Sequence, residues 1–131
     1  MSRQFKPLQT IFDAKAAIGT GAAILVEDFK TATLQIGTAS SGSLTMKIQT
    51  SDSDTCPNFA TAQSVANHWD YVQCVDLEDG STVDGDTGFV VAGADDFKRY
   101  EVNMNGAKWL CATVTARAAG RVTLKVKLFN D

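Results

Sequence analysis

A single histidine limits the acid–base chemistry open to this chain of 131 residues. It is His68, in the run Asn67-His68-Trp69-Asp70. Catalysis by a Ser–His–Asp or Cys–His set would have to pass through this side chain, and no nucleophile motif flanks it. We therefore expect His68 to be a surface loop residue, and we expect the protein not to be an enzyme.

Acidic residues are concentrated in the middle of the chain, where they could bind a cation or act in pairs. Eight fall between residues 70 and 96: Asp70, Asp76, Glu78, Asp79, Asp84, Asp86, Asp95 and Asp96. The run Asp84-Gly-Asp86 does not match a calcium-binding loop, and no pair is marked out as the two carboxylates of a glycosidase. We interpret these residues as exposed turns, and the sequence predicts no metal and no cofactor.

The three cysteines favour a protein made in a reducing compartment. Cys56, Cys74 and Cys111 are odd in number and include no CxxC, which excludes a complete disulfide framework. They also lack the spacing of metal ligands, as does the lone histidine. Cys74 and Cys111 lie in apolar runs and are predicted to be core residues, whereas Cys56 lies in a polar segment and is predicted to be an exposed thiol.

Two aromatic residues could contact a ligand. Trp69 and Tyr71 flank Asp70 at the end of a long polar segment, residues 51–67. An aromatic ring with polar neighbours on the edge of a β-sandwich can stack on a sugar, but a tryptophan at the start of a strand also packs under a loop. Both interpretations stay open. Trp109 begins an apolar run and is expected to pack in the core or at its edge.

The charge balance narrows the range of partners. Twelve Lys and Arg oppose fifteen Asp and Glu, for a net charge of −3, so a generally basic nucleic-acid-binding protein is not expected. No apolar run approaches the length of a membrane span. The first residues, Met1-Ser-Arg-Gln-Phe5, contain no apolar core of a signal peptide.

The elements that would position these residues are strands. Fourteen Thr and eleven Val are frequent for this length, and both residue types favour strands over helices. Residues 31–37 and 43–50 alternate apolar and polar around Ser40-Ser-Gly42, which predicts a hairpin, and residues 109–115 and 121–128 predict a second one around Ala119-Gly120. About eight such segments indicate an all-β domain over residues 10–131, an antiparallel β-sandwich of jelly-roll or Greek-key type.

Residues 1–9 are interpreted as an N-terminal arm. They are polar, contain Pro7, and combine two cations with two apolar side chains: Arg3, Phe5, Lys6 and Leu8. A segment that orders on binding can wrap around a neighbour. We therefore predict that these four residues contact other subunits in an assembly.

The two predicted hairpins carry a resemblance to a family. The first contains Thr31-Ala-Thr-Leu-Gln-Ile-Gly-Thr38 and the run from Gly42 to Asp52, and the second contains Trp109-Leu-Cys-Ala-Thr-Val-Thr-Ala116 and the run from Gly120 to Val126. Over roughly residues 29–128 this pattern resembles the small β-sandwich virion proteins of tailed bacteriophages. The segment 51–67, with Cys56-Pro57, departs from the compact loop of that pattern.

The resemblance implies a structural role in a virus particle. The expected function is that of a capsid decoration or cement protein, which binds the major capsid protein across subunits and stabilises the DNA-filled head. Such a protein would be made in the bacterial host cytoplasm and would lie on the capsid surface as a homo-oligomer, a trimer, without direct contact to nucleic acid or membrane. The alternative is a carbohydrate- or receptor-binding module of a phage tail or head fibre, with Trp69 and Tyr71 as the stacking aromatics.

Overall fold

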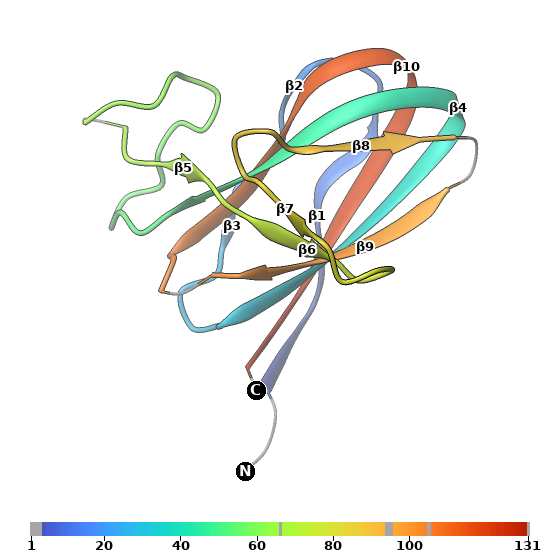
Figure 1. Cartoon of the computed structure of the whole chain (residues 1–131). Helices are drawn as coiled ribbons and strands as arrows, with labels where there is room; N and C mark the ends of the chain where they lie inside the picture. Colours follow the sequence, from blue (N-terminus) through green and yellow to red (C-terminus); the bar gives the residue numbers. More distant parts are fainter. Residues whose placement is uncertain (1–3, 66, 94–95, 105, 131) are drawn as a thin grey trace.

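The computed structural model describes residues 4–65, 67–93, 96–104 and 106–130. These residues form one antiparallel sheet of ten strands, joined by turns and loops, and contain no helix (Figure 1). No described helix could therefore span a membrane. The strands are β1 (Gln4–Lys15), β2 (Gly19–Thr20), β3 (Ile24–Leu25), β4 (Thr31–Ser51), β5 (Asp70–Tyr71), β6 (Cys74–Asp76), β7 (Thr82–Val83), β8 (Phe89–Ala92), β9 (Phe97–Asn103) and β10 (Trp109–Asn130). The predicted all-β class is confirmed.

Two very long strands form the frame of the sheet. β4 has 21 residues and β10 has 22. They pair with each other along nearly their whole length, from Ser51 opposite Trp109 to Thr31 opposite Phe129. The remaining strands attach to this pair on both sides, in the order β1-β10-β4-β9-β6-β7, with β2 and β3 on β10 and with β5 and β8 on β4.

The two predicted hairpins are wrong, because each is one continuous strand that bends. The residues predicted to turn, around Gly42 and Gly120, lie opposite each other where the register between β4 and β10 shifts between Ala119 and Arg121. A Cβ atom on Gly42 would lie 2.2 Å from the carbonyl oxygen of Ala119, and Gly120 has a φ of +89°. Glycine here permits a close approach of two backbones and a bulge rather than a chain reversal.

The bend divides the sheet into two halves that face each other. The first half contains residues 31–38 of β4, residues 121–130 of β10, and strands β1, β9, β6 and β7; the second contains residues 43–51 of β4, residues 109–114 of β10, and β2, β3, β5 and β8. Figure 1 shows β4 and β10 curving over at the bend. The two layers expected of a sandwich are therefore the two halves of one sheet.

The core lies between the halves because one face of the sheet is apolar on both sides of the bend. Even-numbered side chains of β4 are buried before and after it, including Leu34, Ile36, Leu44, Met46 and Ile48. Alternate residues of a strand point to the same face, so the predicted alternation is confirmed although the hairpins are not. Across the core, Phe89 of the second half stacks on Tyr100 of the first, with ring centroids 4.1 Å apart.

The structure also differs from the sequence prediction at the N-terminus. Residues 4–9, assigned there to an arm, form the first part of β1 and pair with β10, from Gln4 opposite Asn130 to Gln9 opposite Val126. The polar composition and Pro7 that suggested an arm are accommodated in a strand with bulges, since the register shifts between Lys6 and Gln9 and again beyond Thr10. Arg3 lies outside the described residues.

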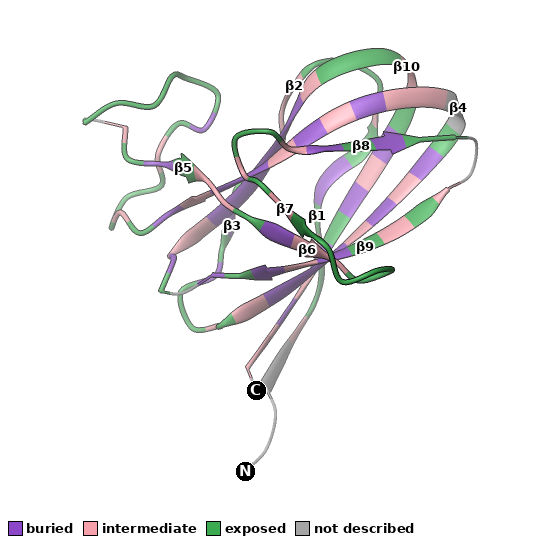
Figure 2. Ribbon diagram, in the orientation of Figure 1, coloured by how far each residue is buried: buried purple, intermediate pink, exposed green. Residues whose placement is uncertain are grey.

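The outer faces of the two halves are covered unequally. Over the second half, the segment between β4 and β5 packs Phe59 and Trp69 onto buried Cys111, with Tyr71 and Trp109 at the margin. Over the first half, exposed and part-buried positions alternate with buried ones along β9 and β10, and no described segment packs a second apolar cluster there (Figure 2).

Candidate binding groove

The long polar segment between β4 and β5 is an ordered loop held by its own polar groups. Asn67 joins the second half of the loop to the first, since its Oδ1 accepts from the backbone N–H of Asn58 at 2.9 Å and its Nδ2 donates to the Asn58 carbonyl at 2.8 Å. Gln49 of β4 donates from Nε2 to the carbonyl of Phe59 at 3.0 Å, which fixes the loop to the sheet. Compact surface loops of this kind are frequently functional.

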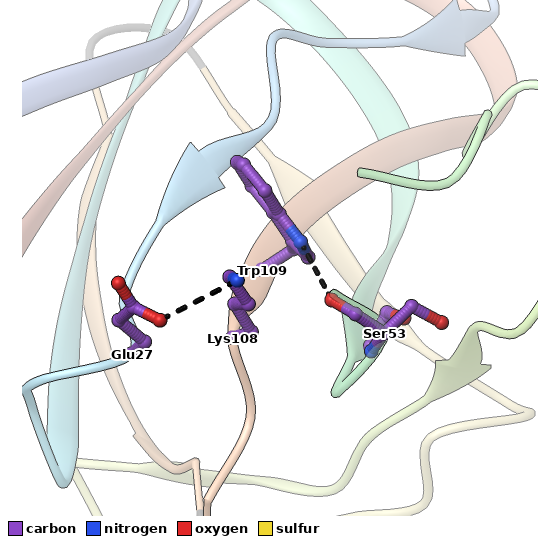
Figure 3. Close-up of polar contacts among 5 residues, drawn as sticks. Glu27, Ser53, Lys108 and Trp109 are labelled. Carbon is purple, nitrogen blue, oxygen red and sulfur yellow. Dashed lines mark hydrogen bonds and ion pairs between the residues drawn. The ribbon is translucent and has the colours of Figure 1, made fainter. Parts of the chain in front are cut away.

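Trp109 fixes the start of the same loop to the sheet, whereas its neighbour Lys108 contacts the segment between β3 and β4. The indole N–H of Trp109 donates to the carbonyl of Ser53 at 3.0 Å, and Lys108 pairs with Glu27 at 3.6 Å (Figure 3). Trp109 is part-buried and packs against the Phe59–Trp69–Cys111 cluster. The prediction that it packs at the edge of a core is confirmed.

A groove of about 1090 Å³ runs beside this loop. Its walls come from the end of β4, the loop, β5 and the following residues, and the exposed ends of β6 and β9. Among the described residues, the lining includes three carboxylates, Asp52, Asp70 and Glu101, and no Lys or Arg. Amide groups of Gln63, Gln73 and Asn103 also line it. This lining is rich in hydrogen-bond acceptors and repels anions, so it suits a neutral or cationic polar ligand.

Trp69 and Tyr71 both line this groove, in different roles. Trp69 is 9% exposed, its Nε1 donates to the carbonyl of Thr61 at 3.1 Å, and its ring contacts Phe59 and Tyr71. This is the packing of a tryptophan under a loop. Tyr71 is part-buried, and Lys47 Nζ lies 4.7 Å from its ring centroid. A ligand in the groove would therefore meet Tyr71 more fully than Trp69.

His68 is exposed and lines the groove, as a surface loop residue should. The hydroxyl of Ser51 donates to the backbone carbonyl of His68, not to its imidazole. Among the described residues, the imidazole has no hydrogen bond to a serine, threonine or cysteine. The described part of the chain also contains no cluster of side chains that could hold a metal ion.

The cysteines lie where the sequence predicted. Cys74 and Cys111 are buried and Cys56 is exposed. Burial, together with the charge of nearby Asp76, raises the pKa of Cys74 to about 12. Burial raises the pKa of Cys111 to about 11. A thiol reacts as its thiolate, so neither buried cysteine is a nucleophile near neutral pH.

The predicted assembly residues of β1 lie far from the groove in the strand order. Lys6 is part-buried, with Nζ 6.0 Å from the ring centroid of Phe29, and Leu8 is exposed. Phe5 pairs with Phe129 through its backbone. β1 is the first strand of the sheet order, whereas Tyr71 lies on β5, which pairs with β4 in the other half. The structure does not bring the two predicted sets together.

Several groove residues were not singled out from the sequence. Glu101 and Asn103 come from the end of β9, about 30 residues beyond the loop they face. Only the pairing of β9 with β4 and β6 places them there, and no local sequence signal marks that pairing. The sequence signal that pointed to this region was the pair Trp69 and Tyr71 at the end of a long polar segment.

No family model matches the chain, and no curated protein matches it. Two solved structures are similar. The SPBc2 prophage-derived protein YomS superposes with a TM-score of 0.72 at 15% identity, covering 99% of this chain and 96% of that one. The chain shares its fold. The PBSX exported protein XepA superposes with a TM-score of 0.65 at 14% identity, and this chain, covered to 99%, spans 39% of XepA.

Proposed function

We propose that this chain is a phage-encoded structural protein that decorates and cements the capsid. The observation that supports this most is the shared fold with YomS, a prophage-derived protein, over nearly the full length of both chains. The alternating strand pattern over residues 29–128, which resembles that of small virion proteins, points to the same class, although its two expected turns are bends within β4 and β10. The proposed location is the outer surface of the particle, and the proposed partner is the major capsid protein.

The proposed role needs a rigid binding body and no chemistry. The bent sheet supplies that body, since β4 and β10 cross both halves and tie them covalently. A subunit that binds only the assembled shell stabilises that shell in proportion to its occupancy. Several weak contacts from one oligomer add through effective concentration. We propose accordingly that the protein is not an enzyme and that it acts as a homo-oligomer.

The location is tested by fractionating particles of the phage that encodes this chain. Purified heads and tails are separated, and the protein is quantified in each by mass spectrometry. The proposal expects it on the heads at a fixed ratio to the major capsid protein. Its presence on tails alone, or its absence from particles, would contradict the proposal. A His68→Ala variant should reach the heads at the same occupancy, since no catalytic step is involved.

The groove supports a second candidate function, the binding of a carbohydrate on a receptor. Its acidic and amide-rich lining offers acceptors to sugar hydroxyls, and Tyr71 supplies an aromatic surface. Such sites combine a few polar groups with an aromatic wall.

A glycan array with the whole protein tests this second function. Binding that is lost in both Tyr71→Ala and Asp70→Asn variants, and kept in an Asp84→Asn control outside the groove, would favour it. An array without any binding glycan would leave the structural role as the only proposal.

A further inference from the structure

The uncovered outer face of the first half combines cations with an exposed aromatic ring. Directly opposed residues of neighbouring strands project to the same side of a sheet. Lys125, Gln35 and Arg99 form one such row across β10, β4 and β9. The next row is Thr123, Gly37 and Phe97. Phe97 is 59% exposed, and the space above Gly37 is open.

Three cations of this face, Lys125, Arg99 and Arg121, have no ion-pair partner among the described residues. Lys125 and Arg99 lie two strands apart, about 10 Å. Arg121 precedes Lys125 by four residues on β10. All three are exposed, and none forms an ion pair or a side-chain hydrogen bond with a described residue. Glu101, one row further along β9, is the carboxylate nearest in register. A chain with net charge −3 thus presents a locally basic, partly apolar surface.

The same face ends in an acidic turn. β6 pairs with β9, and the turn after β6 begins where the backbone N–H of Leu77 donates to the carbonyl of Arg99 at 3.0 Å. Leu77 is 39% exposed, and exposed Glu78 and Asp79 follow it. Hydrogen bonds from Ser81 lower the pKa of Asp79, which keeps this carboxylate ionised. The face is therefore basic in its middle and acidic at one edge, with an apolar side chain in each part.

We propose that this face binds the same face of a second copy of the chain. In a two-fold pair the basic row of one copy lies against the acidic turn of the other, and the reverse contact forms at the same time. Phe97 and Leu77 supply the apolar contacts, and the charges set the orientation. The inference deepens the proposed self-association and does not depend on where the protein sits on a particle.

The test is a charge swap read out by analytical ultracentrifugation at low salt. The Arg99→Glu/Lys125→Glu variant makes the face acidic, and the Glu78→Lys/Asp79→Lys variant makes it basic. Each should associate with itself at least about tenfold more weakly than the parent chain. An equimolar mixture should restore the pair as a heterodimer, because both contacts are then attractive. Salt should dissociate the parent pair and the heterodimer alike.

A matched control carries the same change of charge outside the basic row and the acidic turn. Lys30→Glu/Arg117→Glu replaces one lysine and one arginine at exposed positions, and its association should equal that of the parent. Circular dichroism verifies that each variant is folded, and the milder Arg99→Gln/Lys125→Gln variant replaces any that is not. A monomeric parent chain would overturn both this interface and the proposed self-association. If the parent chain is an oligomer whose association is unchanged by all of these substitutions, or if the mixed variants fail to form a heterodimer, the proposed interface on this face is wrong and self-association elsewhere is not.

Discussion

Burial separates the three cysteines into one accessible thiol and two inaccessible ones. Cys74 and Cys111 are 2% and 0% exposed, and their pKa values are raised, whereas Cys56 lies exposed in the loop. The sequence predicted this division because apolar runs and polar runs bury their members differently. It could not decide between two roles for Trp69, since both place a tryptophan at the end of a loop, and only the packing against Phe59 decides between them.

Thiol labelling should therefore proceed in two stages. In the folded protein at neutral pH, an excess of a maleimide should modify Cys56 and leave the other two cysteines protected. All three should react after unfolding in urea. Mass spectrometry counts the labels. A Cys56→Ser variant should take up no label while folded, and rapid labelling of Cys74 or Cys111 in that variant would contradict the described burial.

Alkaline pH should destabilise the fold. Burial raises the pKa of Tyr100 to about 12 from an ordinary 10.0, and those of Cys74 and Cys111 to about 12 and about 11 from 9.0. The unfolded chain loses these protons first, so the stabilisation is full below about pH 9 and is lost as the pH rises through the folded pKa values. Each group contributes up to about 1.4 kcal/mol per pH unit.

Urea unfolding between about pH 8 and pH 11 measures this loss. The free energy of unfolding should fall over this range, and a Cys74→Ala variant, although less stable throughout, should show a shallower fall. Equal slopes in the two proteins would contradict the assigned burial of that thiol.

At the scale of the element, β4 and β10 show what a local pattern can and cannot predict. The alternation along residues 31–37 and 43–50 placed the apolar side chains correctly on one face. The Ser-Ser-Gly run between them is equally compatible with a turn and with a bend, because a glycine serves both. The choice depends on a partner about 80 residues away, since β10 offers a continuous edge to both segments. The segment 4–9 was misassigned for the same reason.

The two glycines of β4 should differ in how far a substitution by alanine lowers the free energy of unfolding. A Cβ at Gly42 would overlap the backbone of Ala119 and Gly120, whereas one at Gly37 meets nothing within 4 Å. Gly42→Ala should lower the free energy of unfolding by about 2 kcal/mol or more, and Gly37→Ala should change it by less than about 0.5 kcal/mol. Denaturant titration of both variants provides the comparison. A tolerated alanine at position 42 would mean that the strands separate at the bend.

For the whole molecule, the unequal covering of the two outer faces is the feature that most affects function. The second half hides its outer face under the loop of residues 52–69, whose edge forms the groove. The first half leaves its outer face to solvent, with charges of both signs. Trp69 and Tyr71 marked one wall of the groove from the sequence, but the pairing of β9 that builds the rest of the groove and the basic row was not visible locally. The similarity of this chain to YomS and XepA is a similarity of fold.

The most direct test of the cement proposal compares complete particles with particles that lack this protein. A nonsense mutation in its gene gives the depleted particles, and supply of the purified protein gives the matched control. Both are heated or subjected to osmotic shock, and released DNA is measured. We predict that depleted particles assemble but release DNA at a lower temperature, and that added protein restores retention. Depleted particles that retain DNA equally well yet fail to adsorb to cells would contradict the cement role and favour receptor binding.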